Sequence, residues 1–108
     1  MKFGKAKKPQ LHSQIQKAVM EYLQWHKWFV YRNKAGMLSH PGISDLTGLA
    51  RTNFDLLSVW IEIKTPGQKQ TKDQKIFEQE VLSHGGRYWL VTSIEDLQSN
   101  LRDLGLEK

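Results

Sequence analysis

Glu62 and Lys64 are separated by one residue in the segment Trp-Ile-Glu-Ile-Lys (60–64), whose aromatic and β-branched residues predict a β-strand. Because successive side chains of a strand point to opposite faces, the carboxylate and the ammonium project from one face, about 6.5–7 Å apart at their Cα atoms. Together they can hold a divalent cation and a phosphate oxygen. The spacing alone is a weak signal, because Asp73 and Lys75 repeat it and a half-exposed strand often shows Glu and Lys to water.

Asp45 supplies a second carboxylate upstream of Glu62. We expect residues 43–50 and 56–64 to form neighbouring strands joined by a turn at 51–53. The ends of these strands that lie away from the turn then come together, with Asp45 opposite or nearly opposite Glu62. At that separation the two carboxylates can share a metal ion.

Mg²⁺ or Mn²⁺ suits this arrangement, since Mg²⁺ prefers carboxylate oxygens, a main-chain carbonyl and retained waters. Asp45, Glu62 and the main-chain carbonyl of Ile63 could supply the protein ligands. The ion would polarise a phosphate oxygen and lower the pKa of a bound water. Lys64 could orient that water or balance the charge that develops on the phosphate. We expect these side chains to face a solvated cleft.

Less specific interpretations of the same residues stay open. Asp45 can be a turn residue that follows the Pro-Gly pair at 41–42, and Asp55 is a rival acid at the other end of the strand pair. Trp60 shares a face with Glu62 and is expected to pack under a helix rather than against a base. The four histidines show no spacing typical of metal ligands: His12, His26, His40 and His84. His40 is close to Asp45 in the sequence and could approach the site.

Hydrophobic periodicity and turn residues place these side chains on seven elements. The predicted elements are a helix at 11–27, strands at 28–32, 43–50 and 56–64, a helix from Thr71 to about Ser83, a strand at 87–92 and a last helix from Ser93. The first three strands form an antiparallel meander, and the fourth, reached through a helix, runs parallel to its neighbour. The order α-β-β-β-α-β-α indicates one α/β domain with a mixed four-stranded sheet.

Single residues add local detail to these elements. Ser13 and Thr71 each precede a glutamine by three residues, which is the pattern of a capping box. The Gly-Gly pair at 85–86 ends the second helix, and Gly48 indicates a bulge or a close backbone approach in its strand. The second helix is expected to bury Ile76, Phe77, Val81 and Leu82.

The chain has 108 residues and a formal charge of +5, which favours an anionic partner such as nucleic acid. We interpret residues 1–10 as a flexible basic arm and residues 11–108 as a single domain. The sequence has no cysteine, no apolar run of about 20 residues and no signal-peptide pattern, which argues against disulfides, thiolate metal sites and a membrane span. The basic residues expected to bind nucleic acid are Lys7, Lys8, Arg51, Lys69, Lys72 and Lys75.

Three motifs occur in a recognisable order: Pro-Gly-Ile-Ser-Asp-Leu, Trp-Ile-Glu-Ile-Lys-Thr-Pro and Thr-Lys-Asp-Gln-Lys. With the elements around them, over about residues 14–92, they resemble the VRR-NUC (virus-type replication-repair nuclease) domains of the PD-(D/E)XK nuclease superfamily. The resemblance implies a restriction-endonuclease-like core in which Asp45 and Glu62 bind the metal. It also implies that Lys64 is the catalytic lysine and that Gln74 supports the site.

The resemblance further implies a metal-dependent endonuclease that hydrolyses phosphodiester bonds in branched DNA, such as Holliday junctions or flaps, in the cytoplasm of a bacterial or phage-infected cell. Stand-alone members act as homodimers, and two apolar sets could form the interface here: Trp25, Trp28 and Phe29, or Leu97, Leu101, Leu104 and Leu106. The chain departs from the family at helix one, where Glu21 lies on a different turn from the usual glutamate. The alternative is therefore an inactive DNA-binding module with a nuclease fold, or a subunit of a repair or packaging complex.

Overall fold

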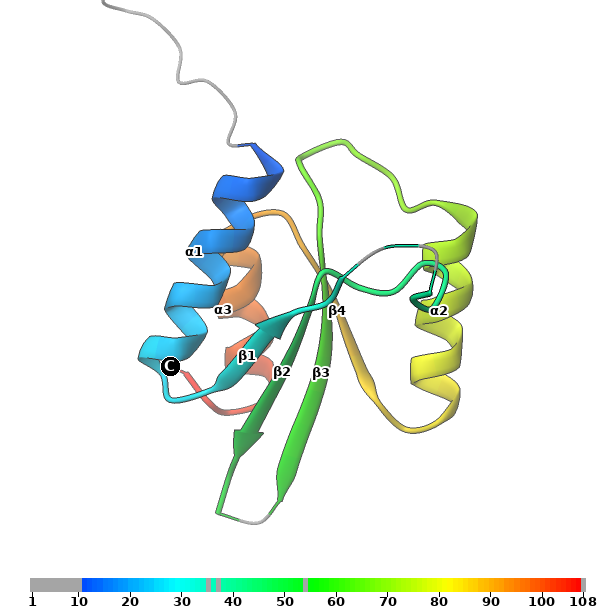
Figure 1. The fold of residues 1–108 in the computed structure, drawn as a ribbon. Helices are drawn as coiled ribbons and strands as arrows, with labels where there is room; N and C mark the ends of the chain where they lie inside the picture. Colours follow the sequence, from blue (N-terminus) through cyan, green and yellow to red (C-terminus); the bar gives the residue numbers. More distant parts are fainter. Residues whose placement is uncertain (1–10, 35, 37, 54, 108) are drawn as a thin grey trace, which may run out of the picture.

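The computed structural model describes residues 11–34, 36, 38–53 and 55–107. It confirms the predicted order of elements in one α/β domain (Figure 1). These elements are α1 (His12–Trp25), β1 (Phe29–Arg32), β2 (Leu46–Arg51), β3 (Leu56–Ile63), α2 (Lys72–Ser83), β4 (Arg87–Val91) and α3 (Ile94–Asp103). The predicted basic arm lies outside the described residues, within which no helix is long and apolar enough to cross a membrane.

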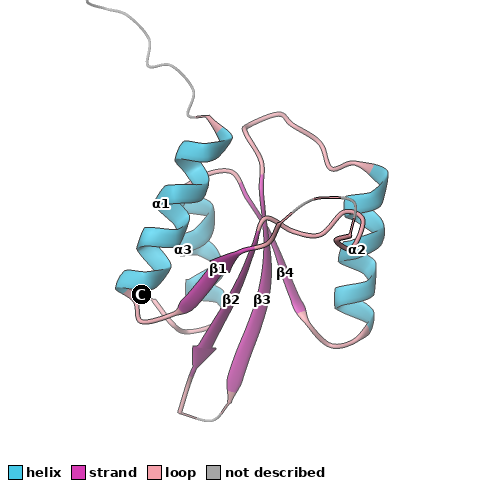
Figure 2. Cartoon of the chain, in the orientation of Figure 1, coloured by secondary structure: helices cyan, strands magenta, loops and turns pink. Residues whose placement is uncertain are grey.

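The strands form one mixed sheet in the order β1-β2-β3-β4. β1 pairs antiparallel with β2 and β2 antiparallel with β3, whereas β4 runs parallel to β3. The parallel pair is joined through α2, because parallel strands need a long crossover connection. α1 and α3 cover one face of the sheet, and α2 lies on the other (Figure 2). The predicted meander and the parallel fourth strand are confirmed.

The main core lies between the sheet and the layer formed by α1 and α3. α1 contributes Ile15, Val19 and Leu23, which recur every four residues and so form one apolar stripe. Every second side chain of each strand packs against this stripe, because alternate residues of a strand point to the same face of the sheet. The other core residues include Val30, Leu46, Val59, Ile61, Ile63, Trp89, Val91, Leu97 and Leu101.

β2 begins at Leu46 rather than at residue 43, so Asp45 lies just before the strand. Gly48 allows a close approach, as predicted, because a Cβ at this position would lie 3.1 Å from the ring of Trp28. The pairing of β2 with β3 continues unbroken through Gly48. The alternative prediction of a bulge is therefore wrong.

α2 begins at the predicted cap. Thr71 Oγ1 accepts a hydrogen bond from the Gln74 N–H at 3.1 Å, and Gln74 Oε1 accepts one from the Thr71 N–H at 2.8 Å. The helix ends before Gly85, whose φ of +83° is the left-handed conformation that glycine adopts at helix ends. As predicted, α2 buries Phe77, and it half-buries Val81.

Two local predictions are wrong. Ser13 does not cap α1, because the cap is Leu11, whose N–H donates a hydrogen bond to Gln14 Oε1 at 2.9 Å. Ile76 and Leu82 of α2 are 49% and 48% exposed rather than buried. The covered stripe of α2 is therefore narrower than its sequence pattern indicates.

The loop between β1 and β2 reaches the first turn of α2 (Figure 1). Gly42 in this loop has a φ of +72°, and a Cβ there would lie 2.1 Å from the main-chain oxygen of Asp73. Only glycine fits this position, for reasons of both conformation and space. In the same loop, the His40 ring packs edge-on against Phe77, with the ring centroids 5.3 Å apart. The loop and α2 therefore pack together.

Candidate active site

Asp45 lies opposite Glu62 across the pair of strands β2 and β3. Leu46 pairs with Ile61, and continuing this register by one residue brings Asp45 opposite Glu62. The two carboxylates are close enough for the charge of Asp45 to raise the pKa of the Glu62 carboxyl. The proximity predicted from the position of the turn is confirmed.

Glu62 is held firmly inside the protein, with only 2% of its surface exposed. Glu62 Oε2 accepts a hydrogen bond from Gln74 Nε2 at 2.8 Å and lies 3.7 Å from Lys64 Nζ. The other oxygen, Oε1, is buried without a hydrogen-bond partner. A buried polar atom left unpaired costs about 1–3 kcal/mol. Glu62 Oε1 therefore marks a position where a bound cation would lower the energy.

Asp45 is half-buried and is oriented from two sides. Asp45 Oδ2 accepts a hydrogen bond from the main-chain N–H of Ile63 at 2.8 Å and lies 3.2 Å from Nε2 of His12, in the first turn of α1. Ile63 follows Glu62 directly, so the first of these bonds ties the two acidic residues together. Sequence reasoning missed His12, because no spacing pattern links it to Asp45. The histidine closer in sequence, His40, packs against α2 instead.

Asn33 holds the backbone around Asp45, although its sequence context predicts only a loop. The N–H of Asn33 donates a hydrogen bond to the main-chain oxygen of Asp45 at 2.9 Å, which continues the β1–β2 pairing by one residue. The Asn33 side-chain amide donates to the main-chain oxygen of Ser44 at 3.0 Å and to Thr47 Oγ1 at 2.8 Å. Asn33 therefore fixes the chain on both sides of Asp45.

Burial, and then the charge of Asp45, raise the pKa of the Glu62 carboxyl to about 8, although the Lys64 ammonium acts in the opposite direction. Burial also raises the pKa of the Tyr88 hydroxyl, with a further contribution from the charge of Glu62. Gln70 Nε2 donates a hydrogen bond to this hydroxyl at 3.3 Å. With no cation bound, the raised pKa of Glu62 favours its protonated form.

Glu62 and Lys64 are both buried, and the expected solvated cleft is wrong. Lys64 is only 4% exposed. At the C-terminal end of β3, Ile63 points into the main core on one face of the sheet. On the other face, which carries Glu62, α2 covers the strand and Gln74 contacts Glu62. Truncating either charged side chain therefore removes buried contacts as well as charge, so it is expected to cost stability.

The described residues contain no group of three or more acidic, histidine or cysteine side chains arranged to hold a metal ion. Asp45 and Glu62 nevertheless offer two carboxylates, and Glu62 Oε1 is a buried oxygen without a partner that could serve as a ligand of a divalent cation. Mg²⁺ commonly takes one or two protein carboxylates and keeps several waters. The pair therefore fits Mg²⁺ or Mn²⁺, and the carbonyl of Ile63 as a further ligand stays a prediction.

The basic residues predicted to bind nucleic acid do not form one patch. Three are exposed in the loop before α2 and at the start of that helix: Lys69, Lys72 and Lys75. Arg51 is also exposed, but it pairs with Leu56 beside the β2–β3 turn, at the opposite end of β3 from Glu62. The predicted contacts Lys7 and Lys8 lie outside the described residues.

α1 presents a histidine, rather than a glutamate, to the candidate site. Glu21 is exposed and lies nine residues after His12, or roughly 13 Å along the helix axis. Glu21 therefore does not complete the site. The group from helix one that contacts Asp45 is the His12 imidazole.

Comparisons of the chain with protein-family models, with curated proteins and with solved structures find no match. The structure itself establishes the mixed α/β architecture and the close arrangement of four side chains: Asp45, Glu62, Lys64 and Gln74. A function for this chain is therefore inferred from these side chains and from the sequence motifs that contain them.

Proposed function

We propose that this chain is a metal-dependent DNA endonuclease with a PD-(D/E)XK core of the VRR-NUC type, and that it hydrolyses phosphodiester bonds in branched DNA. The observation that carries the proposal is the buried carboxyl of Glu62, which faces Asp45, lies beside Lys64 and leaves its Oε1 unpartnered. Apolar side chains often stabilise a core better than buried charges do. Clusters of ionisable groups with perturbed pKa values are instead common at functional sites.

Each residue of the cluster has a role in this proposal. Asp45 and Glu62 would hold the cation, which when bound supplies Lewis-acid stabilisation of the phosphate and lowers the pKa of a water. Gln74 keeps Glu62 Oε2 engaged, so that Oε1 is the oxygen left for the ion. Lys64 brings a positive charge against the phosphate oxygens, where negative charge develops during hydrolysis. His12 holds the orientation of Asp45.

The charge of the protein supports DNA as the substrate. The formal charge of +5 favours a polyanion. Exposed lysines stand at the start of α2, the helix that carries Gln74 to the candidate site: Lys69, Lys72 and Lys75. Lysines in this place can bind backbone phosphates on either side of the bond that is cut, without reading the base sequence.

A second candidate is a nuclease-fold DNA-binding module without activity of its own, or a subunit of a repair or packaging complex. The low exposure of Glu62 and Lys64 favours it, because a substrate phosphate has to reach both groups. The histidine that replaces the glutamate of helix one favours it as well. The nuclease and the inactive DNA-binding module both bind DNA, so these two differ only in catalysis.

Labelled four-way junction, flap and duplex DNAs, incubated with and without Mg²⁺ or Mn²⁺, test the proposal. We expect cleavage that requires the ion and that is lost in Glu62→Gln, which keeps the shape of the side chain but removes its charge. Glu21→Gln, at an exposed position on α1, is the matched control and should cleave like the parent. Binding without cleavage by the folded parent, with either ion, would support the inactive module instead.

A further inference from the structure

A row of four side chains crosses the sheet beside the candidate active site. Tyr31 pairs with Thr47, Thr47 with Trp60, and Trp60 with Tyr88. Residues paired across neighbouring strands point to the same face, and here it is the face opposite the main core. Glu62 lies on this face two residues after Trp60, or about 7 Å along β3. The row therefore runs next to Glu62.

Part of this face is open to solvent. α2 packs on β4, whereas β1 contacts α1 on the opposite face, and no helix of the described chain covers β1 from this side (Figure 2). Phe29, Tyr31 and Leu56 all point to the open face and are 63%, 42% and 61% exposed. The rings of Phe29 and Tyr31 contact each other, with centroids 5.5 Å apart. The sheet therefore presents exposed aromatic rings at this edge.

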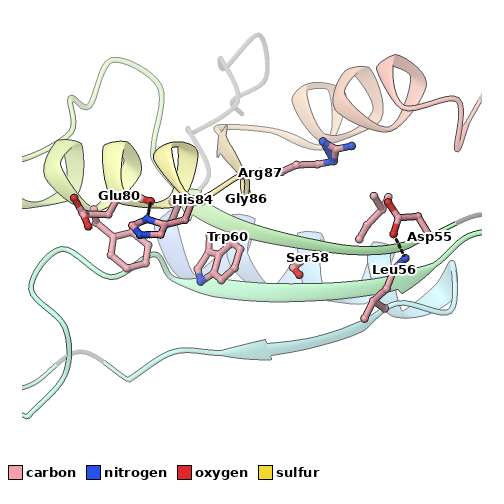
Figure 3. Close-up of a pocket in the computed structure, with 12 residues that line it drawn as sticks. Asp55, Leu56, Ser58, Trp60, Glu80, His84, Gly86 and Arg87 are labelled. Atoms are coloured by element: carbon pink, nitrogen blue, oxygen red, sulfur yellow. Dashed lines mark hydrogen bonds between the residues drawn. The ribbon is translucent and has the colours of Figure 1, made fainter.

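A cavity of about 460 Å³ lies on the same face, between β3 and the C-terminal end of α2. Figure 3 shows Trp60 and Ser58 along β3, with His84 on one side of them and Asp55 on the other. Arg87 also lines the cavity. The cavity therefore combines an indole ring with acidic, basic and hydroxyl groups.

We propose that this face binds the unpaired bases of a single-stranded DNA arm, with one base in the cavity against Trp60 and others against Tyr31 and Phe29. The inference rests on the proposed nuclease function and adds to its branched substrates those with a single-stranded arm, such as a flap. Bases of any sequence stack on aromatic side chains. Tyr31 and Trp60 are two strands apart, about 10 Å, so one DNA strand can reach both.

The charges around the cavity favour a base over a phosphate. Asp55 and Glu80 repel phosphate, whereas carboxylates and arginines both find hydrogen-bond partners on base edges. Arg51 is exposed on the same face and can bind backbone phosphates outside the cavity. Trp60 lies two residues before Glu62 on the same face of β3, so the junction of such a strand with duplex DNA would lie next to the candidate active site.

Binding of two oligonucleotides of equal length, a thymidine strand and an abasic strand, tests the proposal by fluorescence anisotropy. EDTA is present, so no cleavage occurs and the result does not depend on nuclease activity. Both strands carry the same phosphates, so a difference in affinity reports contacts to bases. We expect the thymidine strand to bind more tightly, by roughly 5- to 150-fold for each stacked base.

Phe29→Ala and Tyr31→Ala should reduce this preference for the thymidine strand over the abasic strand. Trp60→Leu should also reduce it, because it removes the ring that a base in the cavity would stack on. Trp25→Ala is the matched control, because its indole is 83% exposed but stands at the end of α1, away from the open face. Equal affinities of the parent for the two strands would overturn the proposal. An unchanged preference for bases in Phe29→Ala and Tyr31→Ala would overturn it as well. A parent dimer that these variants convert to a monomer would also overturn it, because the face would then bind a second copy of the chain.

Discussion

Gln74 connects the cap of α2 to the carboxyl group of Glu62. Gln74 Oε1 accepts a hydrogen bond from the Thr71 N–H at 2.8 Å, while Gln74 Nε2 donates to Glu62 Oε2 at 2.8 Å. Because one end of the amide only accepts and the other only donates, a flipped amide would lose both bonds. One side chain therefore sets both the start of the helix and the orientation of Glu62.

Gln74→Ala should weaken both the fold and the candidate site. The N-cap bond from the main-chain N–H of residue 74 to Thr71 Oγ1 remains, but the Thr71 N–H loses its acceptor. The buried Glu62 Oε2 loses its hydrogen-bond donor, which costs about 1–3 kcal/mol. We expect the free energy of unfolding, measured in urea, to fall by about 1–3 kcal/mol, and cleavage to fall in protein that is still folded. Gln79→Ala, at an exposed position on the same helix, should change neither quantity. Full activity in folded Gln74→Ala would remove Gln74 from the site.

The raised pKa of Glu62 should make the cation-free protein less stable as pH rises. Between the ordinary value of 4.5 and about 8, folded Glu62 keeps a proton that the unfolded chain has released. The contribution of this proton to the free energy of unfolding is complete below pH 4.5, the ordinary pKa of the group. It decreases by no more than about 1.4 kcal/mol per pH unit and is lost as pH rises through about 8. Urea unfolding at a series of pH values should show the parent losing stability relative to Glu62→Gln, which does not titrate. A constant difference would contradict the raised pKa.

A divalent cation should reverse this loss of stability. An ionised Glu62 is the form that binds metal, so binding should release a proton and should strengthen as pH rises. An ion present at 100 times its dissociation constant adds about 2.7 kcal/mol to the free energy of unfolding. Thermal unfolding should therefore show a higher melting temperature with Mg²⁺ or Mn²⁺ in the parent and in the control Asp55→Asn. The increase should vanish in Asp45→Asn and Glu62→Gln, and an increase that survived in both would place the ion elsewhere.

The pairing of Asp45 with Glu62 could be predicted because it depends on local signals. The turn after Arg51 fixes the register of the two strands, and a register fixes which side chains share a face. These signals do not show what covers that face. Glu62 and Lys64 are buried because α2 packs there, and that packing is a tertiary contact which strand alternation does not contain. The solvated cleft was therefore the wrong expectation.

His12 and Asn33 could not have been assigned to the site from the sequence. His12 is on α1 and Asn33 follows β1, and each meets the Asp45 segment only when its element has packed against the sheet. The exposed Ile76 has the same explanation. Helical periodicity shows which residues of α2 share a stripe, but not how wide a stripe the sheet covers.

Most members of the two apolar sets predicted as a homodimer interface are buried in the monomer. Leu97 and Leu101 of α3 are buried, and two leucines that follow this helix pack against the same core: Leu104 and Leu106. Trp28 is buried as well. Trp25 and Phe29 are exposed, but Phe29 points to the open face of the sheet while Trp25 ends α1 on the other side. Trp25 and Phe29 are therefore the exposed members of these sets, and of the two only Trp25 lies away from the proposed DNA face.

Paired cuts on a four-way junction require two sites, and each chain carries one candidate site. A two-fold dimer would supply both sites by using the same surface patch twice. We expect light scattering at micromolar concentration to show a dimer that Trp25→Ala weakens and that Phe29→Ala leaves intact, because Trp25, alone among the residues of the two sets, combines high exposure with a position away from the proposed DNA face. A strict monomer, with and without junction DNA, would exclude paired cutting and leave the single cut of a flap.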